Sequence, residues 1–352
     1  MPVRSYRPEI DKVGCVRGQL IVATCADCIT SCPTGALFEA ADGTLSLHPD
    51  ACTGCGACVA ACPETAIRQP SPARDRVVQA SSARLTLVCD RHPAAGGSDT
   101  LACVHCLGLA DLARLWRAGL RRIDVATGEC INCSTCPPDR LDDQLLRFNS
   151  LARSRGLAEI VFRPAGAKTL SAWRKNNMAL SDPGADPDAA PDPGRRAFLR
   201  RFTTATATAP TADLPENGAD LTAFIQQIST DIDPIFPVSP QIDPALCSAC
   251  DACTSVCPHG ALILINDEND KLSYRVTESR CTGCGVCVDV CDEDAIVLAR
   301  MTGFEPDIPL SRYRCKACGN WQNSTDNAPS RDGLCRICRV NDSRRNLFVI
   351  LP

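Results

Sequence analysis

Twelve residues, from Cys52 to Pro63, constrain this chain more than any other stretch. They read Cys-Thr-Gly-Cys-Gly-Ala-Cys-Val-Ala-Ala-Cys-Pro, which is the spacing C-x2-C-x2-C-x3-C-P. Three thiolates on one short loop converge on a single iron–sulfur cluster, and the fourth ligates a neighbouring cluster, so such runs occur in pairs. The run therefore predicts a [4Fe–4S] cluster and a second cluster close to it.

Cysteine usage sets the class of protein. The chain has 26 Cys and 4 His in 352 residues. Most Cys lie in C-x2-C pairs, which suit metal ligation better than a disulfide framework, and bare thiolate clusters need a reducing compartment. The net charge of -4 leaves no basic footprint for nucleic acid. With no long apolar run and no N-terminal apolar segment, the expectation is a cytoplasmic protein without a membrane span.

Two more runs lie in the second half of the chain. The first, Cys247 to Pro258, is complete, and the second, Cys281 to Cys291, is complete with Asp292 in place of the usual proline. That replacement affects the turn and leaves the ligands intact. Leu262–Ile265 and Leu272–Val276 are expected to form a hairpin between the runs. The second half therefore contains an internal repeat of the same cysteine unit.

The run nearest the N-terminus is irregular. Cys25 to Pro33 has the last three Cys of the pattern, but Val22 stands where the first is expected. The candidate replacement is Cys15, and the alternative is that Cys15 is an ordinary buried thiol. Both runs of this half continue into Pro-x-x-Ala-hydrophobic. The stretch from Cys15 to Ile67 resembles the bacterial dicluster ferredoxins.

The resemblance to dicluster ferredoxins implies how the ligands are shared. Each cluster takes three thiolates from one run and the fourth from the neighbouring run. The implied sets are Cys15, Cys25, Cys28 and Cys62 (quartet 1); Cys32, Cys52, Cys55 and Cys58 (quartet 2); Cys247, Cys250, Cys253 and Cys291 (quartet 3); and Cys257, Cys281, Cys284 and Cys287 (quartet 4). Four [4Fe–4S] clusters correspond to on the order of 16 iron atoms.

Residues 78–165 have a different pattern, in which apolar strands alternate with amphipathic helices. Strands are expected at Arg84–Cys89, Leu101–Cys103, Arg122–Ala126 and Leu157–Phe162, and helices at Asp111–Ala118 and Asp139–Arg155. This alternation predicts a small α/β domain with a mainly parallel sheet. Its cysteines follow the strands, at the sheet edge where open α/β sheets bind their ligands.

The cysteines of this domain are Cys89, Cys103, Cys106, Cys130, Cys133 and Cys136. Their order resembles the delta subunit of methyl-viologen-reducing hydrogenases, a family with a [2Fe–2S] cluster beside heterodisulfide reductase. The resemblance implies one [2Fe–2S] cluster held by Cys89, Cys106, Cys130 and Cys133, with Cys103 and Cys136 in reserve. A zinc site or metal-free buried thiols are the alternatives. His105 is either a further ligand or an ordinary imidazole.

Residues 166–218 are expected to be a linker. Ser181–Gly194 is too polar and proline-rich to bury a core. Arg195–Phe202 resembles a twin-arginine export motif, but it is internal and no apolar stretch follows it. A short basic amphipathic helix is the preferred interpretation. After the linker, a helix is expected at Asp220–Thr230.

The chain ends in two cysteine knuckles, Cys315/Cys318 and Cys335/Cys338. Four thiolates at this spacing predict a tetrahedral site for zinc or a single iron. The first knuckle is similar to those of rubredoxin-like modules and zinc ribbons. Zinc is favoured because a glycine follows only the first knuckle. Leu347–Leu351 is expected to be a closing strand.

The predicted fold class is α+β, in five parts. These are a dicluster ferredoxin module (1–77), a small cysteine-rich α/β domain (78–165), a linker (166–218), a second dicluster ferredoxin module (219–304) and a four-cysteine zinc-ribbon or rubredoxin-like module (305–352). No nucleotide-binding or nucleophile motif is found, so no catalytic residue is assigned. The long linker suggests that the two ferredoxin modules dock separately.

The expected function is electron relay between protein partners, as a subunit of a larger oxidoreductase. Through the resemblance, that partner is expected to be a hydrogenase or heterodisulfide-reductase type of enzyme, with a formate dehydrogenase as another candidate. Two alternatives stay open. One is a thiol–disulfide enzyme that uses Cys103, Cys106 or Cys136, and the other is a redox-sensing or assembly protein.

Overall fold

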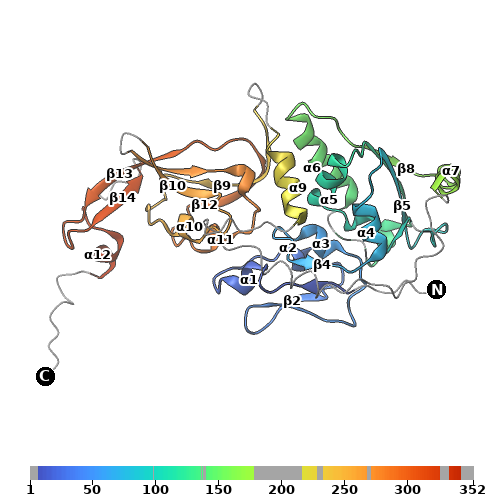
Figure 1. Cartoon of the computed structure of the whole chain (residues 1–352). Helices are drawn as coiled ribbons and strands as arrows, with labels where there is room; N and C mark the ends of the chain where they lie inside the picture. Colours follow the sequence, from blue (N-terminus) through green and yellow to red (C-terminus); the bar gives the residue numbers. More distant parts are fainter. Residues whose placement is uncertain are drawn as a thin grey trace, which may run out of the picture.

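The computed structural model describes residues 7–97, 99–135, 137, 140–177, 216–227, 233–267, 271–325 and 333–341. Cys136, the linker segment 181–194, the basic segment 195–202 and the expected strand 347–351 lie outside these ranges. Figure 1 shows three bodies: an N-terminal unit in blue, an α/β domain in green, and a C-terminal body in orange and red. Within the described ranges, no helix has the length and apolarity needed to cross a membrane.

The N-terminal unit (unit 1, residues 8–68) consists of two short antiparallel strand pairs and short helices in the cysteine loops. β1 pairs with β4, and β2 pairs with β3. The elements are β1 (Glu9–Ile10), α1 (Val16–Gln19), α2 (Asp27–Thr30), β2 (Leu37–Glu39), β3 (Leu45–Leu47), α3 (Ala57–Ala61) and β4 (Ile67–Arg68). The core is small, and buried thiols such as Cys28 and Cys58 belong to it. The unit therefore buries little apolar surface of its own.

The second unit (unit 2, residues 236–302) repeats this layout. An outer pair, β9 with β12, encloses an inner hairpin, β10 with β11, which confirms the hairpin predicted between the runs. The elements are β9 (Phe236–Ile242), α10 (Ala252–Val256), β10 (Leu262–Asn266), β11 (Leu272–Val276), the 3-10 turn η4 (Glu278–Arg280), α11 (Val286–Asp289) and β12 (Ile296–Thr302). The two units therefore share one plan.

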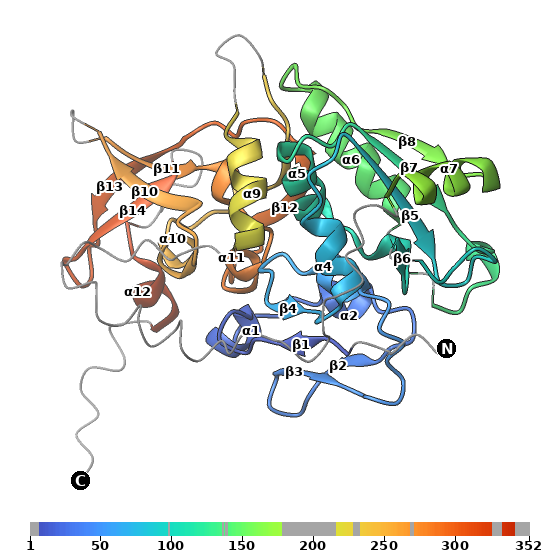
Figure 2. The same cartoon turned by 45° about the vertical axis from the view of Figure 1, so that its right-hand side comes forward.

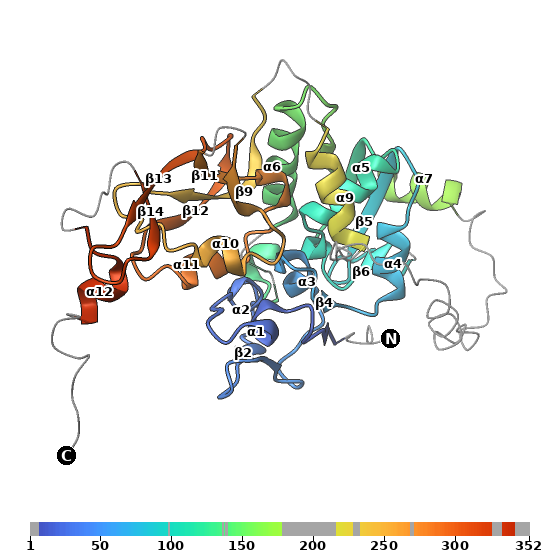
Figure 3. The same cartoon turned by 60° about the vertical axis from the view of Figure 1, so that its left-hand side comes forward.

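Unit 2 differs from unit 1 because its hairpin does not stand alone. β13 (Ile308–Arg314) pairs with β11, and β14 (Trp321–Thr325) pairs with β13, giving a four-stranded antiparallel sheet in the order β10-β11-β13-β14. α12 (Arg336–Asn341) follows β14. The C-terminal module (residues 308–341) is thus joined to unit 2 by backbone pairing, as the orange and red strands in Figure 3 show.

The α/β domain contains a four-stranded sheet in the order β6-β5-β7-β8, and every pair is parallel, as the alternating pattern predicted. Strands β5 and β7 have the predicted bounds. The elements are α4 (Pro72–Val78), β5 (Arg84–Cys89), β6 (Thr100–Leu101), η1 (Val104–Cys106), α5 (Leu109–Arg117), β7 (Arg122–Ala126), η2 (Cys130–Asn132), α6 (Leu141–Arg153), β8 (Val161–Pro164) and α7 (Ala167–Asn177).

Strand β8 begins later than the sequence indicates. The expected strand started at Leu157, but the N–H of Leu157 donates to the carbonyl of Ala152 at 2.9 Å and so closes the end of α6. Gly156 supports this turn with a φ of +66°, a conformation that favours glycine. The residues after α6 therefore cap the helix before the chain enters the sheet.

α9 (Glu216–Ile225) packs on the α/β domain, although the sequence placed it in the second ferredoxin module. The ring of Phe224 is buried between Trp116 of α5, at 5.3 Å, and Phe148 of α6, at 4.8 Å. Arg155 donates to the carbonyl of Ile225 at 3.1 Å. Figure 2 shows α9 beside α5, in front of the strands of unit 2. The predicted boundary at residue 219 therefore falls inside a helix of the α/β domain core.

Candidate metal and cluster sites

The cysteine loops curl because particular residues adopt left-handed backbone conformations. In unit 1, Gly54 and Gly56 have φ values of +70° and +80°. In unit 2, Gly283 and Gly285 have φ values of +85° and +83°. Glycine takes these angles without a Cβ clash, so successive thiols can point to the same side of a tight loop.

The run that begins at Cys247 achieves the same turns without glycine. Ala249 and Asp251 have φ values of +52° and +62°, conformations that cost a residue with a side chain about 1 kcal/mol or more. Asp251 gains contacts in return. Its carboxylate accepts from the Tyr274 hydroxyl at 2.5 Å and from the Asn323 amide at 3.2 Å. The aspartate therefore connects a cysteine loop to the C-terminal sheet.

The thiols of quartet 1 are neighbours in the structure. Burial, and then the charges of Cys62, Cys25 and Cys15, raise the pKa of Cys28 to about 12. Cys25, whose pKa burial raises to about 11, is likewise near Cys62 and Cys15. Cys15, the substitute that the sequence suggested, therefore lies among the other three thiols.

The thiols of quartet 2 also lie together. Burial, and then the charges of Cys55, Cys28, Cys32 and Cys52, raise the pKa of Cys58. A small cavity is lined by all four thiols of this quartet, with loop residues on its rim. Cys28 belongs to quartet 1, so the two quartets of unit 1 are adjacent.

Quartet 3 has the same arrangement in unit 2. Burial, and then the charges of Cys247, Cys250 and Cys291, raise the pKa of Cys253 to about 12. A small cavity is lined by all four of these thiols and, at its edge, by Arg336 of the C-terminal module. The four thiols of quartet 3 therefore line one common cavity.

Quartet 4 completes unit 2. Burial, and then the charges of Cys281, Cys284 and Cys257, raise the pKa of Cys287 to about 12, and Cys253 of quartet 3 adds to this shift. Burial opposes the charged form of a thiol, and neighbouring thiolates also repel one another. A polycationic iron core removes that penalty, so the donor sets of all four quartets fit [4Fe–4S] clusters.

A repeated hydrogen bond is found after the last cysteine of each run. In all four runs, the alanine four residues after the last cysteine donates its backbone N–H to that sulfur. The bonds are Ala36 to Cys32 at 3.2 Å, Ala66 to Cys62 at 3.3 Å, Ala261 to Cys257 at 3.2 Å and Ala295 to Cys291 at 3.3 Å. Such bonds stabilise charge on sulfur and help to set cluster potentials.

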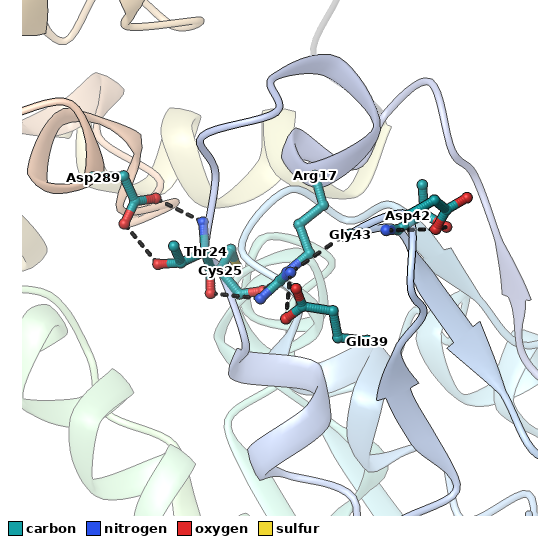
Figure 4. A network of polar contacts seen from close by, with 8 residues as sticks. Arg17, Thr24, Cys25, Glu39, Asp42, Gly43 and Asp289 are labelled. Atoms are coloured by element: carbon teal, nitrogen blue, oxygen red, sulfur yellow. Dashed lines mark hydrogen bonds and ion pairs between the residues drawn. The ribbon is translucent and has the colours of Figure 1, made fainter.

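Arg17 closes the long loop between Cys15 and Cys25. Its guanidinium donates to the carbonyls of Cys25 at 2.5 Å, Thr24 at 2.9 Å and Gly43 at 3.2 Å. It also pairs with Glu39 at 2.8 Å, and only 6% of its side chain is exposed. Figure 4 shows these contacts converging on the one arginine. Through these contacts, Arg17 holds the loop that leads from α1 to Cys25 of quartet 1.

The same loop contacts unit 2. Thr24 donates its N–H and its hydroxyl to the Asp289 carboxylate, at 2.8 Å and 2.6 Å, as Figure 4 shows. Next to this contact, one apolar cluster joins residues of both units: Val16, Leu20, Ala23 and Cys25 with Val256, Cys284, Val286 and Val290. The two ferredoxin-like units therefore dock directly, and the expectation that they dock separately was wrong.

Glu64 forms a second link between the units. It lies two residues after Cys62, and only 8% of its side chain is exposed. It bonds to the Nε2 atom of His259 at 2.8 Å and accepts from the hydroxyl of Thr282 at 2.6 Å. Thr282 directly follows Cys281 of quartet 4. The contact therefore joins ligand loops of quartets 1 and 4.

A cavity of about 490 Å³ lies where the two units and the α/β domain meet. Cys62 and Cys281 are the two thiols in its lining, so the cavity is separate from the space inside any quartet. Glu64, Arg280 and Arg300 are among the charged residues that line it. The cavity therefore reaches one ligand of quartet 1 and one ligand of quartet 4.

The α/β domain presents two thiols to unit 1. A Cβ atom at Gly56 would come within 2.8 Å of the Cβ of Cys106. Burial raises the pKa of Cys106 to about 12; Arg74 opposes this shift and Cys55 adds to it. Cys103 is buried as well, and Cys55 contributes to its raised pKa. Cys106 therefore faces quartet 2.

Only some of the other thiols of the predicted [2Fe–2S] set lie near one another. Cys89 lies near Cys130 and near Cys103, whereas Cys133 is held by Thr135 at 3.1 Å. Within the described residues of this domain, no three Cys, His, Asp or Glu ligand atoms lie within 4.8 Å of one another. The described thiols therefore lack the compact geometry of a single zinc ion.

His105 is held in one tautomer. The N–H of Leu141 donates to its Nδ1 atom at 3.0 Å, so Nδ1 is an acceptor and the proton lies on Nε2. Nε2 points at the Cys130 sulfur at 3.5 Å. Burial lowers the pKa of His105 and keeps the ring neutral. His105 is therefore a hydrogen-bond donor to sulfur, a role that its position between two cysteines did not reveal.

The four terminal cysteines form the most compact group. The sulfurs of Cys315, Cys318, Cys335 and Cys338 lie within 4.8 Å of one another, and those of Cys318 and Cys335 are 3.9 Å apart. Tetrahedral Zn–S bonds of about 2.3 Å require sulfurs about 3.8 Å apart. Backbone hydrogen bonds from Cys318 and Cys335 lower the pKa of Cys315 to about 6. The site fits a single tetrahedral ion.

Comparison with known proteins supports the assignment of the two units. Residues 8–64 and residues 246–296 each match the family model of the 4Fe-4S dicluster domain. Protein NrfC of Escherichia coli (strain K12) is 54% identical over 39 residues, which cover 11% of this chain and 18% of NrfC. Pyruvate synthase subunit PorD of Methanocaldococcus jannaschii is 36% identical over 64 residues, which cover 18% of this chain and 66% of PorD.

The α/β domain and the C-terminal module lie outside both family matches. The chain spans under a fifth of the length of NrfC. The family matches therefore concern units 1 and 2, and the similarity to NrfC covers only a small part of that relative. The two matches support a polyferredoxin-like protein whose units 1 and 2 are similar to 4Fe-4S dicluster domains.

Proposed function

We propose that this chain is an electron-transfer subunit in which quartets 1 to 4 hold four [4Fe–4S] clusters along one continuous path. When bound, such clusters supply reversible one-electron transfer without bond chemistry on an organic substrate. The observation that carries the proposal is the apolar cluster shared by Cys25 of quartet 1 and Cys284 of quartet 4. A free carrier needs only one dicluster unit, whereas two docked units are suited to bridging two partners.

Neighbouring thiols indicate the order of the path. Cys58 of quartet 2 interacts with Cys28 of quartet 1, and Cys287 of quartet 4 interacts with Cys253 of quartet 3. Quartets 1 and 4 meet at the contact between the units, where Glu64 lies. The proposed order is therefore 2–1–4–3, with quartets 2 and 3 at the ends.

The α/β domain covers the quartet 2 end, and we propose that it holds a [2Fe–2S] cluster. Cys89 and Cys130 are the neighbouring pair in this proposal. Cys103, Cys106 and Cys133 are the thiols from which the other two ligands come. The position of Cys106 against Cys55 supports an electron entry or exit at this end.

The C-terminal module lies at the quartet 3 end, and zinc is our proposal for its four-cysteine site. The compact sulfurs support a single ion. In this proposal the zinc ion stabilises the fold of the C-terminal module at the end of the path and does not carry electrons itself.

A larger oxidoreductase is the proposed partner, and the cytoplasm the proposed compartment. PorD, which this chain resembles in part, is by name a subunit of pyruvate synthase. Hydrogenase, heterodisulfide-reductase and formate dehydrogenase types of enzyme are the proposed classes. Substrate thiol–disulfide exchange by Cys103 and Cys106 is disfavoured because only 6% and 3% of these residues are exposed.

The test uses the full chain purified anaerobically. Iron and sulfide analysis should give on the order of 16 iron atoms in the four quartets. Reduction by a low-potential donor should then produce spin–spin interaction between clusters of different units, seen by electron paramagnetic resonance, and no turnover of organic substrates. Half the iron, or two units that are magnetically independent, would contradict the proposal. Partners that co-purify would identify the oxidoreductase.

A further inference from the structure

The C-terminal module is built onto quartet 3, and three contacts show this. Thr325 of β14 donates to the carbonyl of Cys247 at 3.3 Å. Asn323 of the same strand donates to Asp251, next to Cys250, at 3.2 Å. Arg336 of α12 pairs with Asp292, next to Cys291. The module therefore contacts the loops that carry Cys247, Cys250 and Cys291.

Arg336 connects two ligand loops. It directly follows Cys335 of the four-cysteine site, and its partner Asp292 directly follows Cys291 of quartet 3. A second carboxylate, that of Glu293, lies 3.6 Å from the guanidinium. Arg336 also lines the cavity enclosed by the thiols of quartet 3. The positive charge of Arg336 therefore lies at the edge of quartet 3 and next to a ligand of the four-cysteine site.

The pair with Arg336 accounts for the departure from the cysteine pattern at Asp292. The three other runs have proline after the last cysteine, at Pro33, Pro63 and Pro258. With aspartate at this position the turn lacks the rigidity of proline, but the side chain can pair with Arg336. The pair that this aspartate forms joins α12 to the loop of quartet 3. A helix of six residues is unstable by itself in water. Cys335 lies just before α12 and Cys338 lies inside it, so an ion bound by the four cysteines would anchor the helix.

We propose that the four-cysteine module is a metal-dependent cover of quartet 3, and that Arg336 is the positioning residue through which it acts. The inference rests on the proposed function, because it concerns the cluster that quartet 3 would hold. A bound ion fixes α12, and Arg336 then neutralises Asp292 and Glu293 beside the thiolates. A nearby positive charge favours the more negative, reduced state of this site. Loss of the ion releases that charge and uncovers quartet 3.

The first test changes Arg336 in the full, anaerobically purified chain. In Arg336→Gln, the ratio of reduced to oxidised cluster in quartet 3 at a fixed potential should fall about threefold, as expected for a half-exposed ion pair. Arg336→Lys should restore most of the ratio. Arg275→Gln is the matched control, because Arg275 forms an exposed pair with Asp307 at 2.6 Å on the same sheet and does not line the quartet 3 cavity. Potentiometric titration followed by electron paramagnetic resonance measures all three variants.

The second test removes the ion through its exposed ligand. Cys318→Ser should lose the metal, lower the reduced-to-oxidised ratio of quartet 3 as Arg336→Gln does, and speed the bleaching of this cluster by oxygen. Combining the two substitutions should add nothing to the shift. Metal loss without a change in the ratio, or a shift as large in Arg275→Gln, would overturn the inference. Iron analysis separates this from failure of the proposed function, in which quartet 3 would hold no cluster in the unmodified chain.

Discussion

Units 1 and 2 share a strand plan and differ where each departs from the cysteine pattern. Unit 1 lacks the first cysteine of its first run, and the loop from Cys15 to Cys25 that compensates packs on unit 2. Unit 2 has Asp251 in place of a glycine and Asp292 in place of a proline, and both contact the C-terminal module. In each unit, the departures from the pattern mark the surface on which another part of the molecule docks.

This difference has a simple physical basis. The thiol ligands must stay where iron–sulfur geometry requires them, whereas the residues between and after them need only complete a turn. Those intervening positions are therefore available for contacts. Asp251 adopts a strained left-handed φ of +62° and bonds to Tyr274 and Asn323. Contacts of this kind offset a backbone cost of about 1 kcal/mol.

The largest expected effect comes from Cys15. Cys15→Ser should remove the fourth thiolate of quartet 1 and with it about a quarter of the iron of the four quartets. Cys247→Ser, the first ligand of the regular run in unit 2, should have an equal effect on quartet 3. Iron analysis and electron paramagnetic resonance measure both losses. Full iron content in Cys15→Ser would show that Cys15 is an ordinary thiol and that unit 1 completes its site differently.

The next effect concerns the contact between the units. Val16 is 1% exposed in the shared apolar cluster. Val16→Asp should bury an unpaired charge there and weaken the contact by about 2–4 kcal/mol. We expect the spin–spin interaction between quartets 1 and 4 to disappear while the iron content stays the same. Val13→Asp is the control, because Val13 is 81% exposed. An unchanged interaction in Val16→Asp would mean that the loop does not hold the units together.

The sequence predicted what local chemistry determines. The candidate thiol ligands of the four runs could be recognised from the sequence because the spacing between such ligands is set over a few residues. Strands β5 and β7 were predicted with their observed bounds because both are short segments rich in Leu, Ile and Val, residues that favour strands. The placement of α9 was not predictable in this way. Phe224 shows that the helix has an apolar face, but not that Trp116 and Phe148 cover it.

The contacts between the parts were also hidden from sequence reasoning. Glu64, Thr24 and Asp289 are ordinary surface residue types, and only the fold brings them together across more than half of the chain. Asp292 departs visibly from the pattern, but its partner Arg336 lies beyond three strands, β12, β13 and β14. Long-range polar pairs leave no periodic signal, so no window of sequence reveals them.

A smaller effect is expected from restoring the usual proline in unit 2. Asp292→Pro should keep the iron of quartet 3, because proline occupies the same position in the three other runs. It should remove the main partner of Arg336 and weaken the docking of α12 by up to about 1 kcal/mol, since the pair is partly exposed. Proteolysis rates within 333–341 measure this. Arg336→Gln should add little to Asp292→Pro, and a fully additive effect would show that the two residues act separately.

The smallest effect should come from cutting the chain within residues 181–194. From the sequence alone, a tethered relay would lose transfer between its halves when this segment is cut. In the structure, α9 packs back on the α/β domain through Phe224, and unit 2 contacts unit 1 through Asp289 and Glu64. A protease site engineered into 181–194 should therefore leave iron content, the spin–spin interaction and electron flux between partners unchanged after cleavage. Cleavage of the Val16→Asp chain should still leave the two fragments together on size-exclusion chromatography, because Phe224 of α9 remains buried between Trp116 and Phe148. Loss of flux on cutting the unmodified chain would show that the tether, and not the docked surfaces, keeps the path continuous.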